Sequence, residues 1–250
     1  MTLRAFVAGA TGYTGREVAR RLRAAGVQVY AHVRPDSTRL DHWQRTFTDM
    51  QINVDVTPWR ADAMAATLAN LKPDVILCLI GTTAARARRD LRTTGKPASY
   101  EQIDYGLTAL LVDAAKASCP DAYFIYLSAV GASPRALSPY GRWRYRAEEA
   151  VRESGLSYTI ARPSFITGPT RDERRVGERV AASTIDGVLG AAKLLGAKKL
   201  HQRFASMDNS MLARALVALA TADDRPTTIS SDALRNLADN APSARIHIEE

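Results

Sequence analysis

Three glycines stand three residues apart near the start of the chain, in the segment GATGYTG at residues 9–15. The apolar run LRAFVA, residues 3–8, precedes them and predicts a strand, whereas REVARRLRAAG, residues 16–26, has the apolar period of a helix. A strand that passes into a helix through closely spaced glycines is typical of a dinucleotide-binding turn when further strand–helix units follow it. This segment therefore constrains the fold more than any other part of the sequence.

Each glycine has a separate expected role in such a turn. Gly9 allows the chain to turn tightly after the strand, and Gly12 lets the backbone approach a pyrophosphate. Gly15 lets the helix pack closely on the strand, so that the helix N-terminus faces the phosphates. The residues between the glycines are expected to line the same cofactor site: Thr11, Tyr13 and Thr14.

Strand-like and helical patterns alternate from the glycine turn to Pro163. Further strands are expected at residues 27–33, 51–56, 75–81, 122–128 and 157–163, and further helices at residues 38–48, 61–71, 99–117 and 140–155. This alternation predicts an α/β fold, a Rossmann-type doubly wound parallel sheet that binds ligands at the carboxyl ends of its strands. The 250 residues suit a single domain, with residues 1–163 as the cofactor-binding core and residues 164–250 as a small C-terminal lobe that partly covers the site.

The formal net charge of +8 invites a nucleic-acid function, but the pattern of the basic residues argues against it. Most are arginines interleaved with acidic residues on predicted helices, and no nucleic-acid-binding motif occurs. The basic clusters at residues 85–89 and 171–175 are interpreted either as solvated loops or as groups that attract an anionic cofactor or substrate. The sequence thus predicts a small-molecule substrate, anionic or polar-tailed, and no nucleic-acid partner.

Membrane and metal functions find no support in the sequence. The longest apolar run, VILCLI at residues 75–80, is far shorter than the roughly 18 residues of a membrane span. The N-terminal MTLR leads directly into a predicted strand, so we do not expect it to be a signal peptide. Cys78 and Cys119, like the four histidines, show no metal-ligand spacing, and we expect no metal site. Two unpatterned thiols indicate a reduced, cytoplasmic setting.

The end of the second strand indicates which dinucleotide binds. NAD-binding turns place an acidic residue there, which accepts a hydrogen bond from the ribose 2′-hydroxyl. This chain reads HVRPDS, which places Arg34 at the strand end with Arg39 nearby, while Asp36 turns the chain. A guanidinium pairs with a 2′-phosphate, which a carboxylate would repel. The sequence therefore predicts NADP(H) in preference to NAD(H).

Two later strand ends add candidate site residues. Gly81 and Thr82 follow the fourth strand and are expected against the cofactor, because the missing side chain of Gly81 leaves room for the ribose and pyrophosphate. Ser128 follows the fifth strand at the same edge of the sheet. Tyr140 begins the next helix, and Arg144 lies one turn later on the same helix face.

Five segments together give the chain a family resemblance: GATGYTG, CLIGTT, YLSAVGA, the helix with Tyr140 and Glu148, and SYTIARPSFITGP. They resemble the atypical short-chain dehydrogenase/reductases of the NmrA-like type, and most closely the Tat-interacting-protein oxidoreductase group. The resemblance covers residues 3–170. It implies that Asp62 contacts the adenine, although this residue is equally interpretable as a helix cap. It also implies that three residues border the nicotinamide: Pro163, Ser164 and Phe165.

The resemblance further implies a catalytic group. In short-chain dehydrogenases a tyrosine transfers a proton, a serine orients the carbonyl, and a lysine four residues after the tyrosine supports it and holds the nicotinamide ribose. Ser128 and Tyr140 match this pattern, but Arg144 stands at the position of the lysine. Arginine keeps the charge and can bind ribose hydroxyls, yet its planar fork is not equivalent to an ammonium group.

Two functions of different kinds follow from these residues. The first is an NADPH-dependent oxidoreductase that reduces a carbonyl or similarly polarised small molecule, favoured by Ser128 and Tyr140. The second is a catalytically weak or inactive NADP(H)-binding regulator or sensor, favoured by Arg144. Nucleotide-sugar epimerisation uses the same residues, but the short C-terminal lobe argues against it. By the family resemblance, the helices at residues 100–117 and 140–155 would form the face of a possible homodimer.

Overall fold

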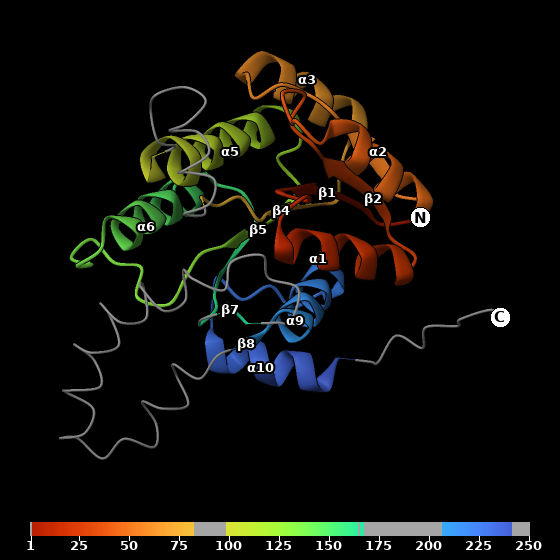
Figure 1. The fold of residues 1–250 in the computed structure, drawn as a ribbon. Coiled ribbons are helices and arrows are strands. Elements are labelled where there is room, and N and C mark those ends of the chain that lie inside the picture. Colours follow the sequence, from red (N-terminus) through yellow and green to blue (C-terminus); the bar gives the residue numbers. More distant parts are fainter. Residues whose placement is uncertain (1, 83–98, 165, 168–206, 242–250) are drawn as a thin grey trace.

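Seven parallel strands form the central sheet of the described chain, in the order β3-β2-β1-β4-β5-β6-β9 (Figure 1). The computed structural model describes residues 2–82, 99–164, 166–167 and 207–241. The strands are β1 (Arg4–Ala8), β2 (Gln28–His32), β3 (Asn53–Asp55), β4 (Val75–Cys78), β5 (Tyr123–Leu127), β6 (Tyr158–Arg162) and β9 (Thr228–Ser230). This order confirms the predicted doubly wound Rossmann-type sheet. The strand order reverses between β1 and β4, and sheets of this type bind ligands at the carboxyl ends of the strands at that switch point.

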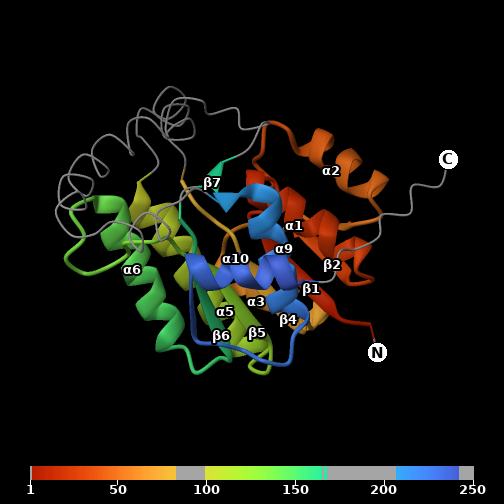
Figure 2. The same ribbon diagram turned by 90° about the horizontal axis from the view of Figure 1, so that it is seen from below.

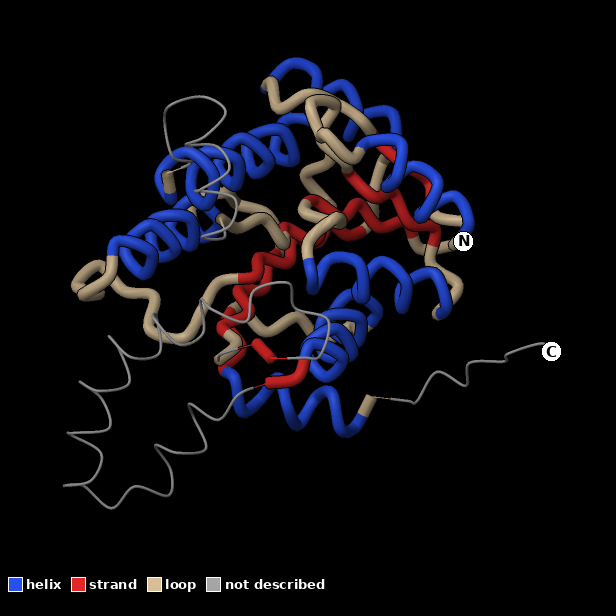
Figure 3. Tube along the Cα trace, in the orientation of Figure 1, coloured by secondary structure: helices blue, strands red, loops and turns tan. Residues whose placement is uncertain are grey.

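Helices cover both faces of the sheet, as the tube in Figure 3 shows. One face carries α1 (Tyr13–Ala24), α9 (Asn209–Thr221) and α10 (Ser231–Asn240), and the other carries α3 (Ala61–Leu71), α5 (Leu107–Ser118) and α6 (Pro139–Arg152). The remaining elements are α2 (Leu40–Asp49), a π-helical turn at Glu101–Gly106, and the strands β7 (Ile166–Thr167) and β8 (Met207–Asp208), which pair in parallel. The sequence patterns thus predicted the helices before residue 163 to within a few residues.

Alternation of side chains along the strands creates two separate apolar layers. In β1, Ala5 and Val7 pack into the layer that contains α1, whereas Phe6 and Ala8 pack into the layer that contains α3 and α5. All four residues are buried. A parallel strand covered by helices on both faces has this all-apolar composition, which is why strand runs such as VILC show no polar alternation.

The C-terminal part of the described chain belongs to the core instead of to a covering lobe. β9 pairs with β6 in the main sheet, and α9 packs along α1 (Figure 2). Met207, Leu212 and Leu216 are fully buried in the same apolar layer as Val7. The described residues after 206 thus join the same sheet and the same apolar layer as the strands and helices before residue 163. Residues 168–206, where a covering lobe is expected, lie outside the described residues.

Candidate functional site

The glycine turn has the close backbone contacts that its spacing predicts. Gly9 has a φ of +84°, and a Cβ at this position would stand 2.6 Å from the carbonyl oxygen of Leu79. A Cβ at Gly15 would stand 2.9 Å from the Cα of Ala10. Both glycines are thus required by the approach of α1 to β1 and β4. Gly12 closes the turn, since its N–H donates to the Gly9 carbonyl at 3.0 Å.

The first turn of α1 is open to an anion. Its N-cap is Gly12, and no side chain caps the helix or adds an acidic group to the first turn. By contrast, Ser138 caps α6 by accepting from Gly141 N at 3.1 Å, and Asp208 caps α9. The uncapped N–H groups lie beyond the carboxyl end of β1, at the switch point of the sheet. This arrangement fits the pyrophosphate of a dinucleotide.

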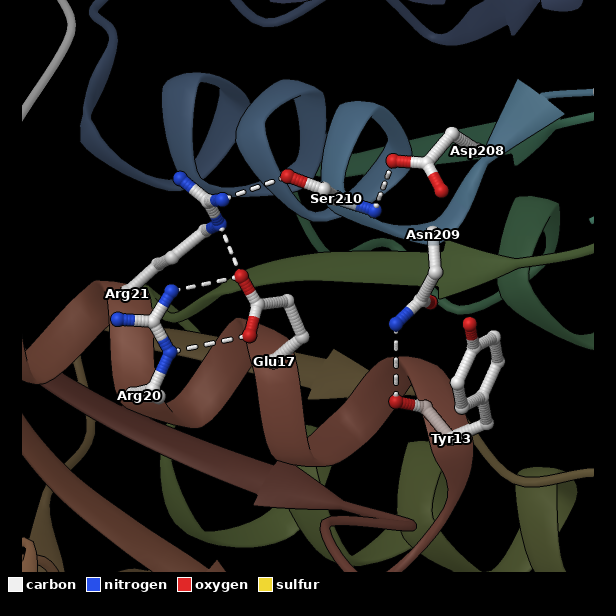
Figure 4. Close-up of polar contacts among 7 residues, drawn as sticks. All are labelled: Tyr13, Glu17, Arg20, Arg21, Asp208, Asn209 and Ser210. Atoms are coloured by element: carbon white, nitrogen blue, oxygen red, sulfur yellow. Dashed lines mark hydrogen bonds and ion pairs between the residues drawn. The ribbon is translucent and has the colours of Figure 1, made fainter. Parts of the chain in front are cut away.

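Polar contacts from α9 hold α1 in place (Figure 4). Asn209 is buried, and its Nδ2 donates to the carbonyl oxygen of Tyr13 at 3.2 Å. Arg21 links Glu17, at 2.6 Å, to the hydroxyl of Ser210, at 2.7 Å. Tyr13 itself is half-buried, as is Thr11, while Thr14 is buried. The turn is therefore fixed by residues near the opposite end of the chain.

Arginines gather at the carboxyl end of β2. Arg34 pairs with Asp36 at 3.0 Å, and the carboxylate of Asp36 is largely exposed. The guanidinium carbons of Arg39 and Arg16 lie 4.8 and 5.4 Å from the ring centroid of Trp43. Sequence reasoning did not select Arg16, although its position directly after the last glycine of the turn was an available signal.

Asp62 stands in the first turn of α3, as expected from the sequence. The N-cap of this helix is Arg60, so Asp62 is not the cap itself. Its exposed carboxylate accepts from Arg60 Nε and Nη2 at 3.2 and 3.0 Å. The hydrogen bond from Arg60 lowers the pKa of Asp62 below its ordinary value. Contact with an adenine stays a prediction.

Arg144 is buried at the junction of several elements. Its Nη2 lies 3.0 Å from Asp104 Oδ1, and both side chains are almost completely buried. Its Nη1 donates to the Leu127 carbonyl at 2.7 Å and to the Tyr126 hydroxyl at 3.2 Å. A Cβ at Gly81 would overlap Nη2. The guanidinium therefore fills the space directly beneath the residue expected to lie against the cofactor.

Asp104 is the main site residue that sequence reasoning missed. It is fully buried, and its Oδ2 accepts from the backbone N–H of Thr82 at 3.1 Å. It thus joins Arg144 to the end of β4. No local pattern indicated its burial, because an acidic residue in an amphipathic helical segment is expected on the solvent-exposed face.

Tyr140 lies half-buried on the first turn of α6. The guanidinium carbon of Arg144 is 5.2 Å from the centroid of its ring, and the ring of Tyr100 meets it edge-on with centroids 5.4 Å apart. The predicted pairing of Tyr140 and Arg144 on one helix face is thus present in the structure. Whether either residue acts in catalysis stays a prediction.

Ser128 is buried at the end of β5, where the sequence places it. Its hydroxyl donates to Glu148 Oε1 at 2.6 Å, and Glu148 is fully buried. The same carboxylate accepts from Arg162 Nε at 2.8 Å and from Arg152 Nη2 at 2.6 Å. The Ser128 proton is therefore engaged within the protein, although the hydroxyl oxygen still has lone pairs that can accept a hydrogen bond.

The segment after β6 carries the residues predicted at the nicotinamide, and their contact with it stays a prediction. Pro163 is buried, and its carbonyl accepts from Val130 N at 2.9 Å, beside the loop that carries Ser128. Ser164 instead turns toward α10, where its hydroxyl accepts from Arg235 Nη2 at 3.1 Å. Phe165 lies outside the described residues.

The described ranges contain neither a cluster of metal ligands nor a membrane-spanning helix. Within them, no group of three or more His, Cys, Asp or Glu side chains could hold a metal ion. The helices of the same ranges include none that is long and apolar enough to cross a membrane. Burial raises the pKa of the Cys78 thiol to about 11, so this thiol stays protonated at neutral pH.

Known proteins share this fold and parts of the sequence. Protein TIC 62, chloroplastic, of Pisum sativum is 30% identical over 207 residues, which cover 74% of this chain and 36% of that protein. Protein fmp52-1, mitochondrial, of Aspergillus terreus is 31% identical over 140 residues, which cover 56% of this chain and 55% of that protein. The chain thus spans about half or less of the length of these relatives.

Solved structures give the same fold. The UDP-glucuronic acid 4-epimerase of Bacillus cereus, in complex with NAD, matches with a TM-score of 0.62 at 15% identity, over 91% of this chain and 78% of that one. ChuY, an anaerobillin reductase of Escherichia coli O157:H7, matches with a TM-score of 0.61 at 16% identity, over 91% and 95%. A family model described as NAD(P)H-binding matches residues 9–187. The chain therefore belongs to the NAD(P)H-binding family of Rossmann proteins that are similar to atypical short-chain dehydrogenases.

Proposed function

We propose that the protein is an NADP(H)-dependent oxidoreductase that reduces a carbonyl or a similarly polarised small molecule. One observation carries the proposal. The half-buried phenol of Tyr140 lies beside the Arg144 guanidinium, and that guanidinium lies directly against Gly81 at the carboxyl edge of the sheet. A proton donor thus stands at the edge of the sheet that carries the glycine turn, with its ring held beside the guanidinium. Carbonyl reduction needs a positioned proton donor, because negative charge develops on the carbonyl oxygen.

Four parts of the chain would hold the cofactor. The uncapped first turn of α1 would bind the pyrophosphate, and Gly81 and Thr82 would face the ribose. Arg16, Arg34 and Arg39 would bind the 2′-phosphate. The exposed pair between Arg34 and Asp36 is no obstacle, since exposed ion pairs contribute little and exchange partners readily.

The chain's own residues would supply the rest of the reaction. NADPH, when bound, supplies hydride to the carbonyl carbon. Tyr140 would transfer its phenolic proton to the carbonyl oxygen, which yields the alcohol and leaves a tyrosinate that water reprotonates. Ser128 would take part only as a hydrogen-bond acceptor while its proton is held by Glu148. Tyr140 would therefore be the main catalytic residue of the proposed reaction.

The remaining expectations about partners belong to this proposal. We infer a small substrate, anionic or polar-tailed, which suits the net charge of +8. A homodimer through α5 and α6 and a cytoplasmic location complete the proposal.

A second function has its own supporting observation. Arg144 is already paired with Asp104, and the Ser128 proton is already donated to Glu148. A catalytic group that is satisfied inside the protein favours a cofactor-binding sensor in which turnover is weak or absent.

Dinucleotide binding and turnover separate these functions. NADPH and NADH would be titrated by nicotinamide fluorescence, and aldehydes and ketones would then be screened by NADPH absorbance. The reductase predicts tighter NADPH binding and turnover that falls by at least about a hundredfold in Tyr140→Phe, with NADPH affinity unchanged. Tyr145→Phe, on the same helix, is the matched control. NADPH binding without turnover of any carbonyl would instead support the sensor.

A further inference from the structure

We propose that Asp104 and Arg144 form a buried brace that positions the ends of β4 and β5 beneath the dinucleotide. Arg144 is then a positioning residue and not, as the lysine of related enzymes would be, a ligand of the cofactor. The inference rests on the proposed function in one respect, namely that the dinucleotide crosses Gly81.

Burial and charge make this pair a rigid element. The Asp104 side chain is fully buried and that of Arg144 is 7% exposed, with the charged atoms 3.0 Å apart. Neither charge is screened by solvent, so each needs the other to compensate its desolvation. Arg144 Nε is also buried and lacks a hydrogen-bond partner in the described part of the chain. The guanidinium is thus turned into the protein.

The contacts of the brace reach the backbone at two strand ends. Asp104 accepts from the N–H of Thr82, just beyond β4, and Arg144 donates to the carbonyl of Leu127, the last residue of β5. Strand ends lose their ladder partners where the sheet stops, so such side-chain contacts fix their position. The brace therefore sets the distance between the segments that follow β4 and β5 at the carboxyl edge of the sheet.

A π-helical turn carries Asp104 into this position. The turn spans Glu101–Gly106, and the hydroxyl of Thr108 donates to the Asp104 carbonyl at 2.8 Å. Such turns are rare and are often found at functional sites. They insert an extra residue per turn, which changes the face on which the following side chains lie.

Two aromatic pairs clamp the same turn to α6 on either side of the brace. Tyr100 meets Tyr140 with centroids 5.4 Å apart, and Tyr105 meets Trp143 at 5.7 Å. Tyr140 and Trp143 precede Arg144 on α6, while Tyr100 and Tyr105 flank Asp104. The proton donor of the proposed reaction is thus held by the structure that holds the brace.

An arginine suits this role better than a lysine. Its planar fork reaches in two directions at once: here Nη2 forms the ion pair with Asp104, and Nη1 donates to the carbonyl of Leu127. A lysine has one nitrogen atom on a flexible chain and cannot occupy both places. The fork also fills the space beneath Gly81, where a Cβ would overlap it. The departure from the family lysine therefore has a structural purpose.

The double variant Asp104→Leu/Arg144→Met tests the brace against a merely structural pair. Replacing both charges with apolar side chains is expected to restore much of the Tm that either single replacement loses, because no unpaired charge is left buried. The brace predicts that NADPH still binds at least about tenfold more weakly to this double variant than to the wild type. It also predicts faster amide hydrogen exchange at residues 79–82. The exposed pair Arg146–Glu149 on α6, replaced by alanines, is the control.

Conservative single variants keep the test decisive if the double variant does not fold. The brace predicts that Arg144→Lys and Asp104→Asn weaken NADPH binding to a similar extent. If Arg144 were a direct ligand of the cofactor, Arg144→Lys would retain affinity and Asp104→Asn would change it little.

Wild-type NADPH affinity in a folded double variant would overturn the brace while leaving the proposed function intact. Conversely, NADPH binding without carbonyl turnover would reject the reductase and leave the brace standing. If the wild type bound neither dinucleotide, the proposed function would fail, and unchanged exchange at residues 79–82 would reject the brace separately.

Discussion

The β1–α1 turn and the β5–α6 side of the candidate site differ in how their polar groups are satisfied. At the β1–α1 turn, the first N–H groups of α1 have no capping side chain, and Gly12 is exposed. At the β5–α6 side, Ser128, Arg144 and Glu148 are buried, and each is hydrogen-bonded inside the protein. Unsatisfied groups bind ligands, whereas satisfied groups hold geometry. The first side therefore has N–H groups that a ligand can use, whereas the polar groups of the second side are already held by partners inside the protein.

Removing a buried hydrogen-bond acceptor on the β5–α6 side should have the strongest effect on stability. Glu148→Ala leaves the Ser128 hydroxyl and the Arg162 guanidinium without their buried acceptor. We expect a loss of about 3 kcal/mol in the free energy of unfolding, measured by urea titration. NADPH affinity should change by less than about threefold. Glu149→Ala, at a half-exposed position next in the chain, is the control; loss of NADPH binding at unchanged stability would place Glu148 in the cofactor site instead.

A substitution in the β1–α1 turn should have a smaller effect on stability and a larger effect on NADPH affinity. Gly15→Ala places a Cβ 2.9 Å from the Ala10 backbone, which forces α1 away from β1. The expected cost is about 2 kcal/mol of unfolding free energy, with NADPH binding lost from the fluorescence titration.

Gly26→Ala is the matched control for this prediction, because Gly26 also adjoins α1 but a Cβ added there would meet no atom within 4 Å. Its positive φ should cost about 1 kcal/mol, without loss of NADPH affinity. Retained NADPH binding in Gly15→Ala would show that the close packing of α1 is not needed for the cofactor.

The arginines near the end of β2 are expected to select NADPH over NADH. Arg16→Ala and Arg39→Ala should each weaken NADPH binding by about tenfold and leave NADH binding unchanged, since only NADPH carries the 2′-phosphate. Isothermal titration with both dinucleotides measures the difference. Arg45→Ala, an exposed arginine on α2, should affect neither. Equal losses for NADPH and NADH would mean that Arg16 and Arg39 support the fold around Trp43 and do not read the phosphate.

The weakest effect that we expect is a pH dependence of stability that arises from His32, at the end of β2. His32 is buried, and burial lowers its pKa below 6.5, although the Thr57 carbonyl at 2.8 Å and Asp55 act in the opposite direction. As the pH falls, the unfolded chain therefore binds the proton first, so stability should be complete above about pH 7 and fall as the pH drops below the unfolded pKa. The Tm of the wild type should thus fall more between about pH 7.5 and 5.5 than that of His32→Gln. Equal slopes would show that other groups cause the pH dependence.

Local sequence patterns were sufficient for much of the fold and for the glycine turn. The glycine turn, its strand and its helix lie within a short segment, and their geometry follows from residues that are neighbours in the chain. Arg34 and Arg39 were selected by their place after a strand, and their contact with a 2′-phosphate stays a prediction. The same reasoning could not find Asp104, because its meaning depends on Arg144 and Thr82, which belong to other elements.

The C-terminal part shows the same limit. The strand β9 has three residues, too few for a pattern, and it exists because β6 offers it a hydrogen-bonding edge. Similarly, Asn209 contacts Tyr13, which lies 196 residues away in the sequence. Neither contact leaves a periodic signal that a single sequence could reveal.

Periodicity and glycine spacing act locally, so the sequence was sufficient to predict the parallel α/β architecture, the dinucleotide turn and the residues at the strand ends. Which of those residues already have partners inside the protein depends on packing between elements that are far apart in the chain. Ser128 and Arg144 carry the expected chemistry at the expected positions, yet their partners, Glu148 and Asp104, are brought to them by packing between elements. Burial makes such partnerships obligatory, because a charge or hydroxyl removed from water must find its counterpart inside the protein.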